Sequence, residues 1–327
     1  MNSQTKPLIA ICIVCYNQEQ YISECIESVL MQKTEFPYKI YIGDDCSTDD
    51  TNRICISYKN KYPDKIELIR NEKNLGLVGN TINVLEKIAQ DGIKYIAMLD
   101  GDDYWINDLK LQIQCGFLEK NSDFGLVYGI SWELKNSKLL KNRKLRNNFE
   151  GSIPLETVWD EPISNNTVVF RTELLKLVEM NDFIARKFMS CDYAMYVVFS
   201  QFTKVKSFDE VFAVVRRGHS SVSHPRQMEQ AIAYVENDIT QFSYLDDYFK
   251  EKFPIKKTDL QTHRDYRVFK IAVKFGNYKL AHQIIKNNEA VKNRQSNFLY
   301  KLKVFCASNP FLFFLWRFFS KIINMSQ

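Results

Sequence analysis

Residues Ile96 to Trp105 read I-A-M-L-D-G-D-D-Y-W, and this stretch decides the fold prediction. Four apolar residues lead directly into Asp100, Asp102 and Asp103. A short continuous apolar run favours a strand that is buried on both faces, as in a parallel sheet. Because parallel sheets bind ligands beyond the carboxyl ends of their strands, we expect these aspartates to face a binding crevice.

The chain before this stretch alternates between strand and helix patterns. Strands are predicted at Leu8–Cys15, Tyr38–Gly43, Ile66–Arg70 and Lys94–Leu99. Helices are predicted from Tyr21 to Leu30, from an N-cap at Ser47 to Tyr62, from the glycine-bearing loop 74–80 to about Ala89, and from Ile106 to Leu118. Such alternation predicts an α/β fold with a mostly parallel, Rossmann-like sheet flanked by helices.

The second half of the chain has a different pattern. A basic stretch, 135–146, is interpreted as a solvated, mobile loop that leaves a substrate or membrane contact open. A strand at Asn166–Arg171, a helix at Ala185–Phe199 and a strand at Val205–Val215 follow, and the chain is predicted helical from Gln227 onward. We therefore expect a domain over residues 1–225, with halves at about 6–130 and 131–225, and a helical C-terminal region over 226–327.

The composition is that of a folded protein in a reducing compartment. The 327 residues are 45% hydrophobic and 25% charged, with a net charge of +5, which is too small to predict nucleic-acid binding. The eight cysteines are scattered, and several lie inside apolar runs, as free cysteines do in the cytoplasm. No secretory signal and no apolar stretch of about 20 residues is visible, so a cytoplasmic location is expected.

Polar residues also end the first two predicted strands, at Cys15-Tyr16-Asn17 and at Asp44-Asp45. Carboxylates held close together repel one another unless a cation offsets their charge. Oxygen ligands favour hard divalent ions such as Mg²⁺ or Mn²⁺, and Mg²⁺ typically takes one or two protein carboxylates. A solvent-exposed turn rich in aspartate is the alternative for residues 100–103. The glycine-rich phosphate motifs of dinucleotide-binding and P-loop folds are absent from the sequence.

Four motifs in order resemble the inverting nucleotide-sugar glycosyltransferases of family 2, whose fold is called GT-A. They are ICIVCYNQEQYISECIESVLMQ, YKIYIGDDCSTDDT, NEKNLGLVGN and YIAMLDGDDYW, and the weaker stretches NNTVVFRTELL and VVRRGHSSVS extend the resemblance over roughly residues 6–223. The chain departs from the pattern at Cys191, where many members have Glu, and at Gly79, where some have Arg. The departure at Gly79 removes a cation and places more weight on Arg217.

The resemblance implies roles for individual residues. Tyr16 would stack on the nucleobase, beside backbone near Val14, and Asp45 with Asp44 would hydrogen-bond the base, which suits uracil. Asp102 would be the direct metal ligand of the D-x-D motif, with Asp100 near the ribose and the metal. The remaining implied positions are Asp192 as general base, Asn17, Asn80, Gly101 and Arg217 as nucleotide-binding residues, and His219 near the diphosphate and metal.

A sugar hydroxyl is a weak nucleophile, so a positioned carboxylate must take its proton, and a divalent ion must stabilise the departing nucleotide diphosphate. We therefore predict a metal-dependent inverting transferase that uses Mn²⁺ or Mg²⁺, a nucleotide-sugar donor, expected to be a UDP-sugar, and a glycan or lipid-linked glycan acceptor. A sugar nucleotidyltransferase-like enzyme and a non-catalytic nucleotide-sugar-binding scaffold are the alternatives. For Trp105 we favour a core anchor over a sugar-facing role.

The C-terminal segment combines aromatic and basic residues. From Ala290 to Gln327 there is no acidic residue, and NPFLFFLWRFFSKIIN is rich in phenylalanine. Such a segment favours a peripheral position on an anionic membrane, at the inner face of the cell membrane. A helix docked on the protein's own core, or a homodimer contact through the C-terminal helices, remains open.

Overall fold

The computed structural model describes residues 6–141, 149–153, 163–217, 227–249, 257–293, 298–314 and 316. The chain divides into two compact units, residues 1–219 and 220–327. The predicted domain boundary at residue 225 falls within 218–226, outside the described residues.

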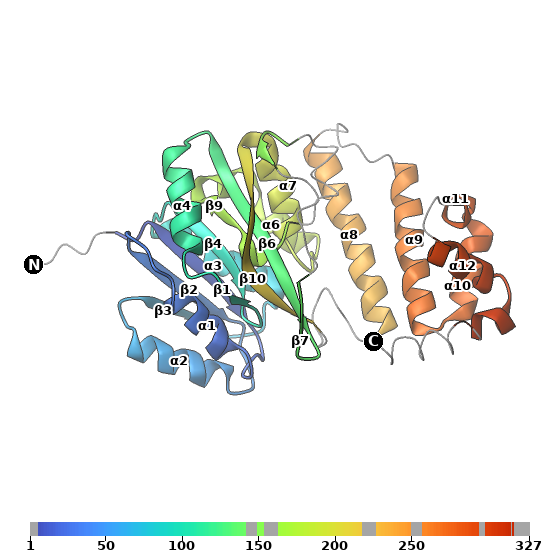
Figure 1. The fold of residues 1–327 in the computed structure, drawn as a ribbon, viewed down its shortest axis with the longest axis horizontal. Coiled ribbons are helices and arrows are strands. Elements are labelled where there is room, and N and C mark those ends of the chain that lie inside the picture. The colour runs from blue at the N-terminus through green and yellow to red at the C-terminus, as the bar shows by residue number, and fades with distance from the viewer. Residues whose placement is uncertain are drawn as a thin grey trace, which may run out of the picture. The chain divides into compact units, whose positions relative to one another are not determined.

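The first unit is built on a ten-stranded sheet (Figure 1). The strand order is β3-β2-β1-β4-β9-β6-β10-β5, with β7 paired to β6 and β8 paired to β10. The strands are β1 (Ile9–Cys15), β2 (Tyr38–Asp44), β3 (Ile66–Arg70), β4 (Tyr95–Asp100), β5 (Tyr104–Trp105), β6 (Phe124–Lys135), β7 (Lys138–Leu140), β8 (Glu150–Gly151), β9 (Val169–Arg171) and β10 (Lys204–Arg217).

Strands β1 to β4 are all parallel, as are β6 and β10, whereas β9 runs antiparallel between β4 and β6. In β1, Val14 lies opposite Gly43 of β2 and Asp100 of β4. This register brings the polar ends of three strands to one edge of the sheet. The mostly parallel α/β fold predicted from the sequence is confirmed.

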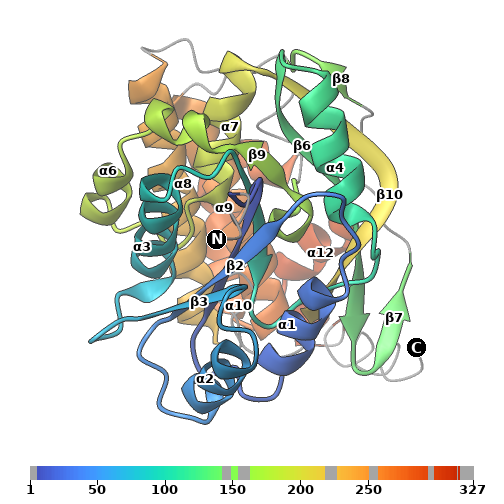
Figure 2. The same cartoon turned by 90° about the vertical axis from the view of Figure 1, so that its left-hand side faces the viewer.

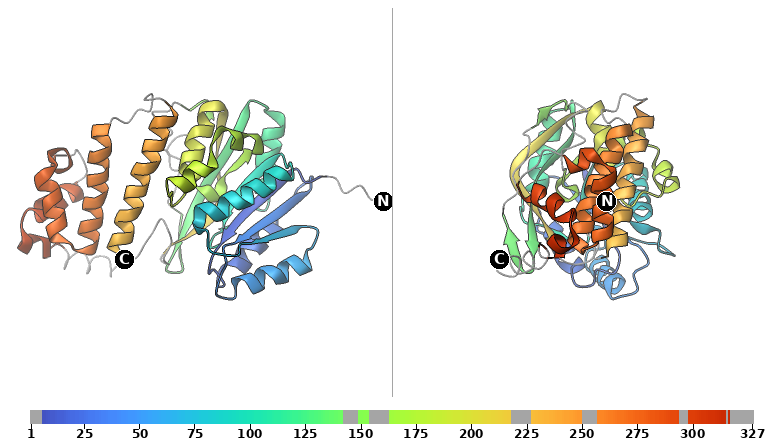
Figure 3. Two further views of the ribbon diagram at one scale, coloured as in Figure 1. Left: turned by 180° about the vertical axis from the view of Figure 1, so that it is seen from behind. Right: turned by 90° about the vertical axis from the view of Figure 1, so that its right-hand side faces the viewer.

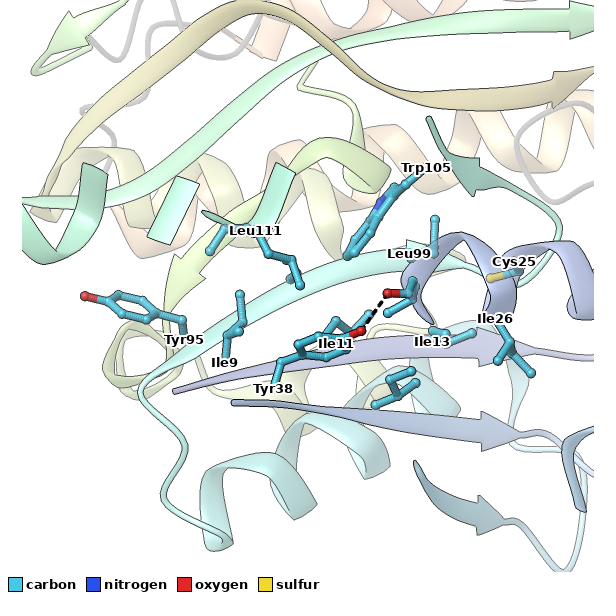
Figure 4. Packing of buried hydrophobic residues seen from close by; sticks show 14 of the residues in the cluster. Ile9, Ile11, Ile13, Cys25, Ile26, Tyr38, Tyr95, Leu99, Trp105 and Leu111 are labelled. Carbon is cyan, nitrogen blue, oxygen red and sulfur yellow. Dashed lines mark hydrogen bonds between the residues drawn. The ribbon is translucent and has the colours of Figure 1, made fainter. Parts of the chain in front are cut away.

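Helices cover both faces of the sheet (Figure 2). They are α1 (Ile22–Leu30), α2 (Thr51–Lys61), α3 (Gly76–Gln90), α4 (Lys110–Lys120), α6 (Met180–Ala185) and α7 (Asp192–Phe202), with short 3₁₀ turns η1 (Asn165–Thr167) and η2 (Thr172–Leu177). Alternate residues of β1, Ile9, Ile11 and Ile13, are fully buried and pack with apolar residues of α1 and α4 (Figure 4). On the opposite face α3 packs on β1 and β2. Burial on both faces explains why the strands read as unbroken apolar runs.

Several predicted boundaries are wrong for local reasons. The second helix begins at Thr51 rather than after Ser47, because the Ser47 hydroxyl instead accepts the Asn17 backbone N–H at 3.0 Å. The helix predicted from Ile106 begins at Lys110, because Trp105 and its neighbour pair with β10. The predicted loop 74–80 already contains the first turn of α3. The helix predicted from Ala185 begins only at Asp192, because Ala185 is the last residue of α6 and residues 186–191 are not helical.

The long central strand β6 was not predicted, because two glycines interrupt its apolar pattern. A Cβ added at Gly125 would lie 2.6 Å from the Thr203 hydroxyl oxygen, and one at Gly129 would lie 2.6 Å from the Phe212 ring. Glycine therefore permits close packing of the neighbouring chain at both positions. This requirement comes from tertiary contacts and has no local sequence signal.

The second unit is helical over its described residues (Figure 3). Its helices are α8 (Met228–Tyr248), α9 (Lys257–Phe275), α10 (Tyr278–Asn287), α11 (Glu289–Lys292) and α12 (Phe298–Ala307). Its core joins apolar residues of α9 and α10, among them Phe269 and Ala281, to Phe313 near the C-terminus. Among the described helices of the chain, none is long and apolar enough to cross a membrane.

Candidate functional site

A buried, hydrogen-bonded carboxylate lies where β2 ends. Asp45 is 2% exposed, and its Oδ1 accepts hydrogen bonds from Asn71 Nδ2 (2.9 Å) and the Leu75 backbone N–H (2.8 Å). Asn71 also donates to Asn80 Oδ1 at 3.0 Å, and Asn80 donates to the Gly43 carbonyl at 2.9 Å. Neutral amide groups thus orient the Asp45 carboxylate at the carboxyl end of β2.

Asp44, the neighbour of this carboxylate, faces into the protein. It is fully buried; its Oδ1 accepts the Ser47 backbone N–H (3.2 Å), and its Oδ2 accepts Asn52 Nδ2 (2.8 Å). Both oxygens therefore hold the turn between β2 and α2. A direct contact between Asp44 and a nucleobase stays a prediction, and its side chain is already engaged within the chain.

The loop after β1 is bound to the loop after β2. Asn17 has a φ of 52°, and its Oδ1 accepts the Thr48 backbone N–H at 2.8 Å. Tyr16 is 45% exposed, as a side chain that stacks on a ligand must be, while Val14 is buried in the sheet and offers only backbone. The geometry is compatible with the implied roles of all three residues, which remain predictions.

The D-x-D turn depends on close backbone approach. Gly101 donates its N–H to the Val14 carbonyl at 3.0 Å. A Cβ at this position would lie 2.3 Å from Gln18 Oε1 and 2.8 Å from Cys15 Cβ. Glycine is therefore required here by contact with the β1 loop. Gln18 Oε1 is itself buried without a hydrogen-bond partner among the described residues.

Four carboxylates gather beyond β4. Burial, then the charges of Asp102 and Asp192, raises the pKa of Asp100 to about 7. Burial, followed by the charges of Asp102 and Asp100, raises the pKa of Asp103 well above its ordinary value. Burial also raises the pKa of Asp192, which is the first residue of α7. The structure thus brings Asp192, at the start of α7, within electrostatic range of Asp100, which shares the turn after β4 with Asp102.

Two residues that the sequence did not single out organise this cluster. Asn166 Oδ1 accepts the Asp100 backbone N–H (2.6 Å), and Asn165 Nδ2 donates to Asp100 Oδ1 (3.0 Å). Both asparagines lie on η1, directly before a strand that the sequence did predict. The two adjacent asparagines just before a buried strand were the sequence feature that could have indicated this role.

The two arginines at the end of β10 point to different partners. Arg216 donates to the Asp102 carbonyl at 2.5 Å, forms an ion pair with Glu24, and lies over the ring of Tyr104 at 4.5 Å. Arg217, the predicted diphosphate ligand, pairs with Glu133 at 3.1 Å. Arg216, which was not among the predicted site residues, thus contacts the D-x-D turn directly, and the charge of Arg217 opposes the rise in the pKa of Asp103. His219 lies outside the described residues.

Trp105 is a core residue, as favoured from the sequence. It is 1% exposed and donates its indole N–H to the Asn166 carbonyl at 2.8 Å. The ammonium of Lys110 lies 4.2 Å from the ring centroid, and burial lowers the pKa of Lys110 to about 7. The Lys110 ammonium donates to the neutral Gln114 Oε1 at 2.6 Å and lies over the rings of Trp105 and Phe212.

The donor set at the turn fits a hard divalent cation. In the described part of the chain, no group of three or more His, Cys, Asp or Glu side chains is arranged as a metal site. Mg²⁺ and Mn²⁺ nevertheless need only one or two protein carboxylates when a substrate diphosphate completes the shell. Burial, and after it the charges of Asp102 and Asp192, raises the pKa of Asp100, and a cation would stabilise the ionised form of this carboxyl.

Comparisons with known proteins agree with this geometry. The family model described as "Glycosyl transferase family 2" matches residues 10–176. An uncharacterised protein of Mycobacterium tuberculosis is 37% identical over 115 residues, which cover 35% of this chain and 32% of that protein. The chain thus spans about a third of the length of that relative.

Two further proteins match over more of their length. WfgD of Escherichia coli, named a UDP-Glc:alpha-D-GlcNAc-diphosphoundecaprenol beta-1,3-glucosyltransferase, is 26% identical over 249 residues, covering 74% of this chain and 92% of WfgD. The structure of Staphylococcus aureus TarS 1-349 with UDP-GlcNAc superposes with a TM-score of 0.56 at 17% identity, covering 93% of this chain and 88% of that one. The latter likeness concerns the fold alone.

Proposed function

Because the chain belongs to glycosyltransferase family 2, we propose that it moves a sugar from a UDP-sugar to a hydroxyl of a glycan or lipid-linked glycan, with inversion at the anomeric carbon. The observation that carries this proposal is the carboxylate cluster beyond β4, where the charges of Asp102 and Asp192 help raise the pKa of Asp100. Family membership favours this reaction over the nucleotidyltransferase and scaffold alternatives.

The nucleobase of the donor would bind at the Asp45 carboxylate. This buried carboxylate is oriented by Asn71 and Leu75, and a carboxylate can accept the N–H of uracil. Tyr16 follows Cys15, whose carbonyl accepts the Asp45 backbone N–H, and its exposed ring offers a face for stacking. The names of WfgD and of the TarS complex, which contain UDP-Glc and UDP-GlcNAc, support a uridine donor.

Asp102 and Asp100 would hold Mn²⁺ or Mg²⁺, with His219 as a further candidate ligand. Such a cation would stabilise the negative charge that develops on the departing diphosphate. Arg216, held between Glu24 and the Asp102 carbonyl, keeps the turn in place on the β10 side. Arg217 remains a candidate diphosphate ligand, and its guanidinium is now paired with Glu133.

Asp192 would take the proton of the acceptor hydroxyl. A general base acts best when its pKa approaches the working pH, and burial raises the pKa of this carboxyl. Direct displacement at the anomeric carbon by the deprotonated hydroxyl inverts its configuration. No covalent sugar–enzyme intermediate is needed, and one base suffices.

The test measures nucleotide diphosphate release across a panel of nucleotide sugars, with and without Mn²⁺ and lipid-linked acceptors. Release is expected from a UDP-sugar and to depend on both the metal and the acceptor. Asp192→Asn should reduce kcat by about 10²–10⁴, the usual contribution of a positioned base, and Asp102→Ala should reduce kcat because the cation loses its direct ligand. Asp123→Asn, which removes an exposed carboxylate paired with Lys204, is the matched control and should retain activity. Full activity in Asp192→Asn would reject the assigned base.

We assign the C-terminal aromatic residues a peripheral role on an anionic membrane. Phe305, Phe311 and Phe314 are 61%, 70% and 64% exposed, whereas Phe313 is fully buried in the helical core. Within the C-terminal segment, Phe313 therefore packs in the core of the second unit, whereas Phe305, Phe311 and Phe314 are exposed to solvent. With no acidic residue from 290 to 327, the charge of this segment complements an anionic lipid surface.

Sedimentation with vesicles of phosphatidylglycerol and phosphatidylcholine tests this assignment. The double change Phe311→Ser and Phe314→Ser should weaken vesicle binding by about tenfold or more. Phe202→Ser, which alters a similarly exposed phenylalanine of the first unit, should leave it unchanged. Unaltered vesicle binding in the double variant, together with dissociation of a dimer in analytical ultracentrifugation, would assign the exposed rings to a homodimer contact instead.

A further inference from the structure

Asn166 joins the two ends of the D-x-D turn. It is 3% exposed; its Oδ1 accepts the Asp100 backbone N–H at 2.6 Å, and its Nδ2 donates to Asp103 Oδ2 at 2.6 Å. One amide thus uses its acceptor on the first aspartate and its donor on the last. Because a side-chain amide carries a donor and an acceptor in one plane, Asn166 can bond both ends of the turn without adding charge.

Asn165 connects the same turn to the helix that carries Asp192. Its Nδ2 donates to Asp100 Oδ1 at 3.0 Å, and its Oδ1 accepts the Tyr196 hydroxyl at 2.6 Å. Tyr196 is 2% exposed and lies four residues after Asp192 on α7, which places it about one turn along the same helix face. The path from Asp100 to α7 is therefore continuous through two hydrogen bonds.

The turn that carries both asparagines is itself fixed. The Thr167 hydroxyl donates toward the Gly129 carbonyl at 3.1 Å and accepts the Gly129 N–H at 3.2 Å, while Gln114 Nε2 donates to the Thr167 carbonyl at 2.8 Å. Trp105 holds the Asn166 carbonyl from another side. Contacts from β6, α4 and β5 thus make η1 a rigid support for the two amides.

We propose that Asn165 and Asn166 are positioning residues that set the distance between the metal-side carboxylates of the D-x-D turn and the base-side helix α7. The proposal rests on the glycosyl-transfer function proposed above. Amide groups suit this task because they orient carboxylates by hydrogen bonds without adding charge to a cluster that is already strongly negative. Asn166 acts on the metal side, and Asn165 with Tyr196 acts on the base side.

The two sides predict different measurements. Asn166→Ala should raise the Mn²⁺ dissociation constant, measured by electron paramagnetic resonance with UDP present, by about tenfold, the lower end of the range for loss of a partner that orients a metal ligand. Tyr196→Phe removes only the hydroxyl and should lower kcat about tenfold, while Mn²⁺ affinity and the KM for the nucleotide sugar stay at wild-type values. A role confined to stability would change neither quantity in the folded fraction.

Asn166→Asp supplies the sharpest discrimination. Aspartate has the same shape as asparagine but would direct a carboxylate oxygen at Asp103, so this change should reduce kcat more than Asn166→Ala does. If Asn166 only fills space, the isosteric change to aspartate should be milder than the change to alanine. Circular dichroism melting of each variant corrects the kinetics for folding.

A double-mutant cycle tests the connection through Asn165. Asn165→Ala and Tyr196→Phe should be non-additive, because both interrupt the same path. Additive losses, or wild-type Mn²⁺ affinity and kcat in Asn166→Ala and Tyr196→Phe, would overturn the positioning role while wild-type UDP release still supports the proposed function. Absence of UDP release from the wild-type protein would instead reject the proposed function itself, and Mn²⁺ binding to the variants would still report on Asn166.

Discussion

Two polar centres lie beyond the carboxyl ends of β2 and β4, and they differ in which polar groups they contain. The centre after β2 contains the carboxylate of Asp45, which is hydrogen-bonded to the amide of Asn71, and Asn71 is in turn hydrogen-bonded to Asn80. The turn after β4 contains a group of carboxylates whose burial and mutual repulsion raise the pKa of Asp100 to about 7. The first centre is balanced by neutral donors, as suits recognition of a neutral base. In the second, buried carboxylates lie within electrostatic range of one another, which fits the proposed cation and proton transfer.

Changing one aspartate to asparagine in each centre should separate the roles of the two centres most strongly. Asp100→Asn should weaken Mn²⁺ binding about a hundredfold with a small effect on donor binding at saturating metal, since a metal-side carboxylate is lost. Asp45→Asn should raise the KM for the nucleotide sugar about tenfold or more, because a charged acceptor is lost, and should leave the Mn²⁺ requirement unchanged. Metal titrations at several donor concentrations check both. Equal effects of the two variants on both quantities would erase the contrast between the centres.

Gly101→Ala should distort the second centre and spare the first. The added Cβ would lie 2.3 Å from Gln18 Oε1 and 3.0 Å from the Val14 carbonyl, so we expect about 1–3 kcal/mol of destabilisation and a weaker Mn²⁺ response. Gly116 in α4 has nothing within 4 Å of an added Cβ. Gly116→Ala should therefore stabilise the protein by about 0.5–1 kcal/mol through helix propensity. Urea denaturation compares the pair, and a Gly101→Ala variant as stable and active as Gly116→Ala would contradict the close approach.

Lys110 gives the smallest expected effect, in the core beneath the second centre. Its pKa is about 7 when folded, and a lysine titrates near 10.4 when unfolded. Between these pH values the unfolded state binds more protons, so this group makes the free energy of unfolding rise with pH, by at most about 1.4 kcal/mol per unit. Lys110→Met should remove that slope.

Denaturation at pH 7 and pH 8.5 checks the prediction for Lys110. The wild-type protein should gain stability relative to Lys110→Met as the pH rises over this interval. The change Lys120→Met, at an exposed lysine of the same helix, serves as the control and should follow the wild-type pH dependence. Parallel pH profiles for wild type and Lys110→Met would show that the buried ammonium keeps its charge throughout.

The sequence alone determined the parallel α/β core and the strand ends at which polar residues collect. Continuous apolar runs such as Ile9–Cys15 favour strands that are buried on both faces, and ligand sites of such sheets lie at the carboxyl ends of the strands. Family 2 membership, expected from four ordered motifs, is likewise confirmed.

Only the tertiary structure decided which side chains orient which. Asn165 and Asn166 are far from Asp100 in the sequence, and the contact of Arg216 with the Asp102 carbonyl joins residues that are more than 100 positions apart. Gly101, Gly125 and Gly129 are required by atoms that lie distant along the chain. Local patterns encode which face of a strand or helix is buried, because that depends on periodicity. Hydrogen-bond partners and close approaches depend on how separate elements pack, and no local pattern carries that information.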